Sequence, residues 1–135
     1  MSDRGDPSSG YTSKASPRSV PDTVRRLTEL VTDRGMTVFS VIDQQAHARR
    51  AGLELRETVL VLFGSPRAGT PVMDRTPLDA LDLPLKVVVW ADGPRTQVSY
   101  LSPPALAARH RIDAELAAPL SGIDALTDEL VRPGD

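Results

Sequence analysis

The segment TVLVLF, Thr58 to Phe63, places the strongest constraint on the fold of this chain. Its apolar residues follow one another instead of alternating with polar residues, so an extended strand here has two apolar faces. Such a strand is typical of the interior of a sheet, with a neighbouring strand on each side. The sequence therefore predicts a sheet with Thr58–Phe63 at its centre.

Further segments have the β-branched and aromatic composition of strands, and the first of them is a candidate edge strand: Lys14–Arg18, Thr37–Ile42, Leu85–Trp90 and Arg95–Tyr100. Asp92 and Gly93 lie between the last two segments and are typical turn residues, so these two strands are predicted to form an antiparallel hairpin. Helical spacing and capping residues predict helices between the strands and after them, over 19–34, 43–51, 77–81, 103–110 and 116–130, the last with a break at Pro119. Ser19 is the predicted cap of the first helix, which ends at Gly35, and Ser121 with Asp124 offers a capping box near the end of the chain. Together these elements predict an α+β domain with a mostly antiparallel sheet of four to five strands and helices packed on one face.

The chain has 135 residues, which is the length of a single domain. We expect this domain to span residues 14–131. Residues 1–13 are rich in Ser, Gly, Asp and Pro and are expected to form a disordered tail, as are residues 132–135 at the other end.

The composition excludes several classes of function. The chain contains no cysteine and only two histidines, which excludes a disulfide framework, a cysteine nucleophile and a three-histidine metal site within one chain. The net charge of −2 argues against nucleic-acid binding. The polar amino terminus does not look like a signal peptide, and no run reaches the ~18 apolar residues of a membrane helix. The sequence therefore predicts a cytoplasmic protein with no metal, no cofactor and no membrane partner.

Several segments resemble the bacterial family called domain of unknown function 302, DUF302. The most specific is the block Phe-Gly-x-Pro-x-x-Gly-Thr-Pro at Phe63–Pro71, and the second is LPLKVVVW at Leu83–Trp90. The resemblance implies a fold similar to the α+β sandwich of the TATA-binding protein, often found as a dimer, and it implies no assigned activity. This chain has Gln44 where members of the family often carry histidine.

The segment GSPRAGT, Gly64–Thr70, has the glycine spacing of a phosphate-binding loop and follows a strand. Thr70 stands where that loop requires lysine, so nucleoside triphosphate binding is not expected. The side chains of Arg67 and Thr70, with free backbone N–H groups of Gly69 and Thr70, would suit a small anion. The favoured interpretation is a stiff corner in which Gly64 and Gly69 supply unusual backbone angles.

Two other residues are candidates for a ligand site. Asp43 follows a strand and is expected to cap the next helix, although a carboxylate there is also a candidate general base. Lys86 lies within an apolar strand, where it reaches water or forms a desolvated, reactive amine. The leading hypothesis is a small-ligand or partner-binding module. The alternatives are an enzyme whose pocket combines Asp43, Lys86 and Phe63–Pro71, and a purely structural interaction module.

We expect the protein to form a homodimer, because the resemblance implies one and the folded part is rich in apolar residues. Light scattering at micromolar concentration should give twice the chain mass of 14.5 kDa. A single species at the chain mass would contradict this expectation.

Overall fold

The computed structural model of the protein describes residues 10–134. Five strands form one sheet: β1 (Tyr11–Ser16), β2 (Thr37–Asp43), β3 (Thr58–Gly64), β4 (Leu85–Asp92) and β5 (Arg95–Leu101). The helices are α1 (Val20–Asp33), α2 (Gln44–Arg50), α3 (Pro66–Arg75), η1 (Pro77–Asp82), α4 (Pro103–His110), α5 (Ala114–Ala117), η2 (Ala118–Ser121) and α6 (Gly122–Leu130). This is the predicted α+β class, and the hairpin of β4 and β5 is confirmed, with Asp92 opposite Arg95.

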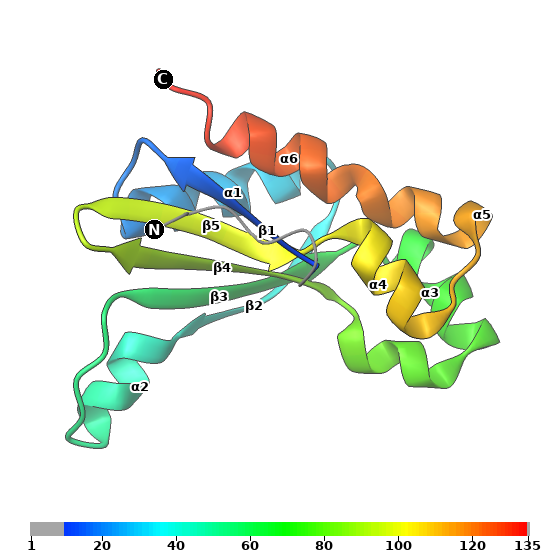
Figure 1. The fold of residues 1–135 in the computed structure, drawn as a ribbon, viewed down its shortest axis with the longest axis horizontal. Coiled ribbons are helices and arrows are strands. Elements are labelled where there is room, and N and C mark those ends of the chain that lie inside the picture. Colours follow the sequence, from blue (N-terminus) through cyan, green and yellow to red (C-terminus); the bar gives the residue numbers. More distant parts are fainter. Residues whose placement is uncertain (1–9, 135) are drawn as a thin grey trace.

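The strands lie in the order β1-β5-β4-β3-β2, and every neighbouring pair is antiparallel (Figure 1). The central strand is therefore β4, and β3, predicted at the centre, is the inner strand beside it. In the same view α3, η1 and α4 gather at one end of the sheet, and α2 lies at the opposite end. The two ends therefore present different sets of side chains.

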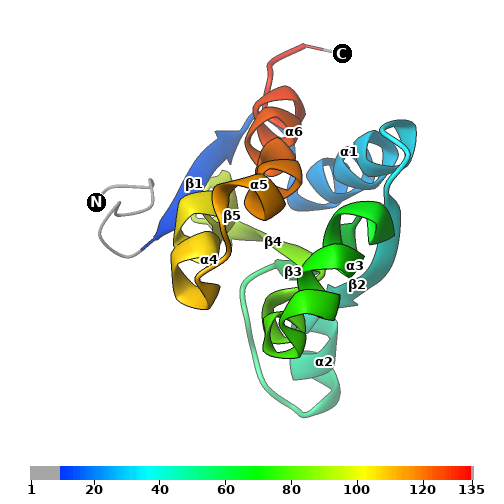
Figure 2. The ribbon, with the colours of Figure 1, turned by 90° about the vertical axis from the view of Figure 1, so that its right-hand side faces the viewer.

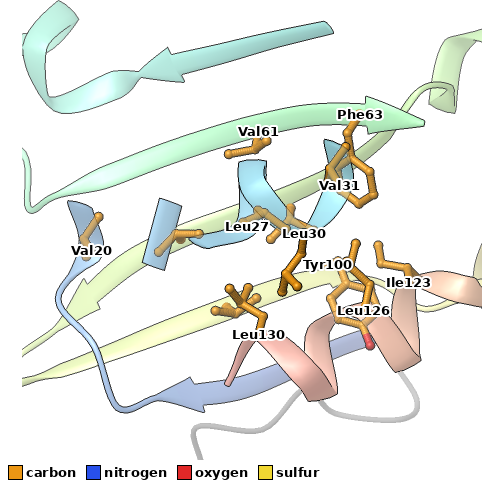
Figure 3. Close-up of a cluster of buried hydrophobic side chains, with 13 residues drawn as sticks. Val20, Leu27, Leu30, Val31, Val61, Phe63, Tyr100, Ile123, Leu126 and Leu130 are labelled. Atoms are coloured by element: carbon orange, nitrogen blue, oxygen red, sulfur yellow. The ribbon is translucent and has the colours of Figure 1, made fainter. Parts of the chain in front are cut away.

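One face of the sheet is covered by α1 and α6, which lie side by side when the sheet is viewed from its end (Figure 2). Their apolar side chains pack on alternate residues of the inner strands (Figure 3). The buried members include Leu27, Val31, Val61, Phe63, Val87, Val89, Val98, Leu126 and Leu130. Buried positions alternate along β4 and β3. This packing therefore fixes the register of the sheet.

The boundaries at the two ends of the domain differ from those expected. Tyr11 to Ser13, expected in the disordered tail, lie in β1 and pair with β5 from Leu101 to Ser99. This pairing uses backbone N–H and C=O groups, which every residue except proline provides, so polar side chains do not prevent it. At the other end, the expected disordered segment begins at Arg132, yet Arg18 donates hydrogen bonds to the carbonyls of Arg132 and Gly134 at 3.3 and 2.7 Å. Residues 1–9 and Asp135 lie outside the described residues.

Most predicted helix boundaries agree with the structure, and one capping interaction does not. Ser19 caps α1 by accepting a hydrogen bond from the Asp22 N–H, as expected, and Gly35 follows the helix with φ of +76°. The predicted capping box at Ser121 is wrong, because its hydroxyl donates to the carbonyl of Ala118 instead. The 3-10 turn η2 runs directly into α6, so this hydroxyl lies inside a continuous helical segment.

A polar cluster fixes the edge strand β1 to α6. The ammonium of Lys14 donates to the Thr127 hydroxyl at 2.6 Å and forms an ion pair with Asp128 at 2.8 Å. It also lies 5.4 Å from the centre of the Tyr100 ring. Burial by itself would lower the pKa of Lys14, but hydrogen bonds with Asp128 and Tyr100 outweigh it and hold this pKa above its ordinary value. The charged form of Lys14 therefore stabilises the folded protein.

Lys14→Met should lower the free energy of unfolding by about 1–3 kcal/mol at pH 8, because hydrogen bonds of a charged group are lost and the Thr127 hydroxyl loses a partner. Since the folded pKa of Lys14 is raised, its contribution is complete below the ordinary value of 10.5 and is lost as the pH rises through the folded pKa. Urea denaturation at pH 8 and at pH 11 should therefore show a smaller difference between wild type and variant at the higher pH.

The matched control is Arg25→Met, which removes an exposed cation paired with Asp22 and should change stability by no more than about 0.5 kcal/mol. An equal loss of stability for Lys14→Met at both pH values would show that its charge is unimportant.

Candidate functional site

The structure places the three components of the suggested enzyme pocket apart. Asp43 is exposed at the end of β2, opposite Val59, and Lys86 pairs with Leu62. Their partners on β3, Val59 and Leu62, are three residues apart, which corresponds to ~10 Å along the strand, and the two residues lie on opposite sides of β3. Asp43 lines a groove between α1 and the start of β3, whereas Lys86 and the segment Gly64–Gly69 line two different pockets at the other end of the sheet. The enzyme alternative, in the form suggested by the sequence, is therefore wrong.

Asp43 has the structural role expected for it. Its carboxylate accepts a hydrogen bond from the N–H of Ala46 at 2.9 Å and caps α2. This bond satisfies one of the N–H groups that the first turn of a helix leaves without a partner.

The segment Gly64–Thr70 is the start of a helix, and the interpretation as a stiff corner is wrong. Ser65 is the N-cap of α3, Pro66 occupies its first turn, and Gly69 lies within the helix. Neither Gly64 nor Gly69 has a positive φ. Pro66 favours a helix that starts here, because N–H groups in the first turn have no partner within the helix and proline has no N–H to leave unpaired.

The anion site predicted around Arg67 and Thr70 does not form as expected. The N–H of Gly69, expected to be free, donates to the carbonyl of Ser65 at 2.9 Å. The side chains of Arg67 and Thr70 are exposed and do not line the pocket beside this helix. Gly64 and Gly69, by contrast, lie on its wall.

This pocket, which we call the apolar pocket, has a volume of about 220 Å³. It lies where the end of β3 and the first turns of α3 meet the start of β4 and η2. Its lining residues are Met36, Phe39, Gly64, Ser65, Pro66, Ala68, Gly69, Met73, Leu83, Pro84, Leu85, Pro119 and Leu120. Among these described residues Ser65 alone has a polar side chain, and its hydroxyl is used in capping α3 at 3.4 Å from the Ala68 nitrogen.

Two local features shape the apolar pocket. A shift in register between Val38 and Ser40 leaves Phe39 without a partner on β3, and this side chain is 51% exposed beside the pocket. Such a bulge redirects a side chain from the regular alternation of a strand. A Cβ at Gly69 would meet the ends of Met73 and Leu83 at 3.6 and 4.0 Å, so the glycine leaves room between these side chains.

A titratable cluster connects α4 with η1. His110 lies between two carboxylates, with Nε2 2.6 Å from Asp82 and Nδ1 3.1 Å from Asp79. Arg109 also contacts Asp82, at 3.1 Å. The hydrogen bond from His110 is the main cause that lowers the pKa of Asp82, and Arg109 lowers it further. Asp82 is therefore a stable anion whose charge is neutralised by its neighbours.

This cluster was not predicted from the sequence. Asp79 and Asp82 lie about thirty residues before His110, and they stand one helical turn apart in PLDALD. Two carboxylates at that spacing can contact the same side chain, but nothing in the sequence identifies His110 as that side chain. Within residues 10–134 no group of three His, Cys, Asp or Glu side chains could hold a metal ion.

The comparisons with known proteins identify a family and a fold. The family described as "Domain of unknown function DUF302" matches residues 12–130. A crystal structure of an uncharacterised conserved DUF302 protein from Bacillus stearothermophilus has a TM-score of 0.77, with 19% identity, over 90% of this chain and 95% of that one. Among the described residues no helix is both long and apolar enough to cross a membrane.

Two curated relatives have a longer chain. Proteins named "Fluoride-specific ion channel FluC 1" from Brucella suis biovar 1 and Brucella abortus biovar 1 are each 34% identical to this chain over 124 residues. The matched part is 88% of this chain in both cases, but 49% and 46% of the relatives. The chain thus spans about half the length of the curated relatives it matches.

Gly69→Ala should raise the free energy of unfolding by about 0.5–1 kcal/mol, because alanine is favoured over glycine inside a helix. The added Cβ has ordinary contact distances of 3.6 and 4.0 Å to Met73 and Leu83, so no strain offsets this gain. Thermal or urea denaturation measures the change. Gly35→Ala is the matched control, since φ of +76° there should make the same substitution destabilising by about 1 kcal/mol. A loss of stability in Gly69→Ala would mean that the helix at this position is not formed.

Proposed function

This chain belongs to the DUF302 family, whose description assigns no activity, and we propose that it is a binding module for the apolar part of a small molecule. The observation that supports the proposal is the apolar pocket. Its wall includes Gly64, Pro66 and Gly69 from the first family block and Leu83 to Leu85 from the second. Two segments that are about twenty residues apart in the sequence thus meet around one space.

The chemistry of the wall favours an apolar occupant. A cavity of ~150 Å³ lined by apolar side chains is sufficient for benzene, and a buried water would need two to four polar partners that this wall does not offer. With a volume of about 220 Å³ the apolar pocket accommodates a single ring or a short alkyl chain. Two methionines on the wall add adaptability, because their unbranched side chains adjust to occupants of different shape.

The same lining argues for binding without catalysis. None of the described residues on the wall has a titratable side chain, so the pocket offers no general acid, base or activated nucleophile. We therefore favour a binding module over an enzyme.

Ion conduction is the second candidate, because the Brucella relatives are named as fluoride channels. Those names apply to proteins about twice as long as the matched part. A pocket with apolar walls offers a dehydrated fluoride ion little compensation for lost hydration. The binding of an apolar group agrees better with the lining.

The test uses the methionine methyl groups as reporters. The chain has three methionines, of which Met36 and Met73 line the apolar pocket. In protein labelled with ¹³C at the methionine methyls, benzene should shift the signals of Met36 and Met73. Binding should also raise the unfolding free energy by about 1.4 kcal/mol at a benzene concentration tenfold above Kd.

Gly69→Leu should fill the apolar pocket and abolish both responses, since its side chain projects toward Met73 and Leu83. Thr70→Leu is the matched control, because it adds a leucine to the same helix at an exposed position. Benzene shifts that persist unchanged in Gly69→Leu, or that are absent in the wild type, would contradict the proposal.

A further inference from the structure

A second pocket lies at the same end of the sheet and has a different chemical character. Its volume is about 190 Å³, and we call it the cationic pocket. The described residues that line it are Tyr11, Asp82, Leu85, Lys86, Leu101, Leu106, Arg109 and Ile123. Two cations and one carboxylate therefore stand on a wall that is otherwise largely apolar.

The Asp82 carboxylate offsets the charge of Arg109 and leaves that of Lys86 without a counter-charge among the described residues of the wall. It is held by His110 at 2.6 Å and by Arg109 at 3.1 Å, and the imidazole itself faces a second carboxylate, Asp79. The role of Asp82 is therefore internal to the cluster, where it orients the guanidinium of Arg109. Because this guanidinium has five N–H donors, its other donors can still bind a ligand.

Lys86 is the second cation of the pocket, and its hydrogen-bonding capacity is little used. Its side chain is half-buried, and the hydrogen bond it makes within residues 10–134 goes to the carbonyl of Pro84 at 3.5 Å, the limit of hydrogen-bond distance. An ammonium has three donors, and a partly buried one gains most from a charged acceptor. Lys86 can therefore bind an anion without losing an existing ion pair.

We propose that the cationic pocket binds a small organic carboxylate, with its carboxylate on Lys86 and Arg109 and its short apolar chain against Leu101, Leu106 and Ile123. A lining of cations beside apolar side chains favours a small organic carboxylate. An inorganic anion would leave the apolar walls without a partner, and a neutral apolar molecule would leave the half-buried ammonium of Lys86 without a charged acceptor. This site is separate from the apolar pocket and does not depend on the function proposed for it.

The NMR signals of the lysine side chains give a direct test of carboxylate binding. The chain has two lysines, Lys14 and Lys86, so reductive ¹³C-dimethylation, which keeps the positive charge, gives one side-chain signal for each. Titration with butyrate should shift the Lys86 signal and leave the Lys14 signal in place. The neutral counterpart 1-butanol should shift the Lys86 signal far less.

Variants of the unmodified protein assign the cations, with butyrate affinity measured by calorimetry. Lys86→Met and Arg109→Gln should each weaken butyrate binding at least about tenfold, as expected for the loss of a charge-assisted hydrogen bond. Arg67→Gln removes an exposed cation from α3 and is the matched control, with unchanged affinity. Circular dichroism and the benzene response of Met36 and Met73 would show that each variant is folded.

Three results would overturn the proposal. The first is a Lys86 signal that does not respond to butyrate, and the second is an equal response to 1-butanol. The third is loss of binding in Arg67→Gln with retention in Lys86→Met, which would place the anion on α3. A failure of the benzene test would leave these results unaffected, because the two experiments report on different residues.

Discussion

Burial of alternate side chains of β3, β4 and β5 beneath α1 and α6 determines the rest of the structure. Because a strand presents successive side chains to opposite faces, a slip of one residue would turn Val61 and Phe63 away from α1 and α6 and remove them from the core. The register selected in this way places Leu85 opposite Phe63, and Gly64 opposite Thr37. Both pockets lie beyond these pairs, at the end of the sheet where β3 finishes and β4 begins. The core thus positions the pockets although most of their lining residues do not belong to it.

Much of the fold could be predicted from the sequence, because the signals for it are local. Strands β2 to β5 follow from composition and alternation, and α4 has the predicted bounds since Ser102, two prolines and a basic end all lie within one short segment. The helix α3 could not be predicted in the same way. Its glycine and two prolines favour a turn by propensity alone, whereas packing of Gly69 and Val72 in the structure favours a helix. Strand β1 was placed too late in the chain for a related reason, since an edge strand of polar residues depends on backbone pairing with β5.

The sites were less predictable than the fold, because each combines residues that are distant in the sequence. The family blocks drew attention to Gly64 and Gly69, which do line the apolar pocket, and Lys86 was identified as an unusual cation in an apolar strand. Phe39 could not be predicted, since its position depends on a bulge in β2. The contact of His110 with Asp79 and Asp82 depends on how α4 packs against η1, and the sequence suggested only that this histidine ends a helix.

Leu85 is part of the wall of both pockets and packs against both hydrophobic clusters of the protein. A side chain on the wall of two cavities can couple their occupancies if it moves. If an occupant on one side displaces Leu85, the space on the other side changes with it. Thermodynamic linkage then requires reciprocity, so that each molecule alters the affinity for the other by the same factor. The two proposed ligands would then communicate through Leu85, the residue that the two walls share.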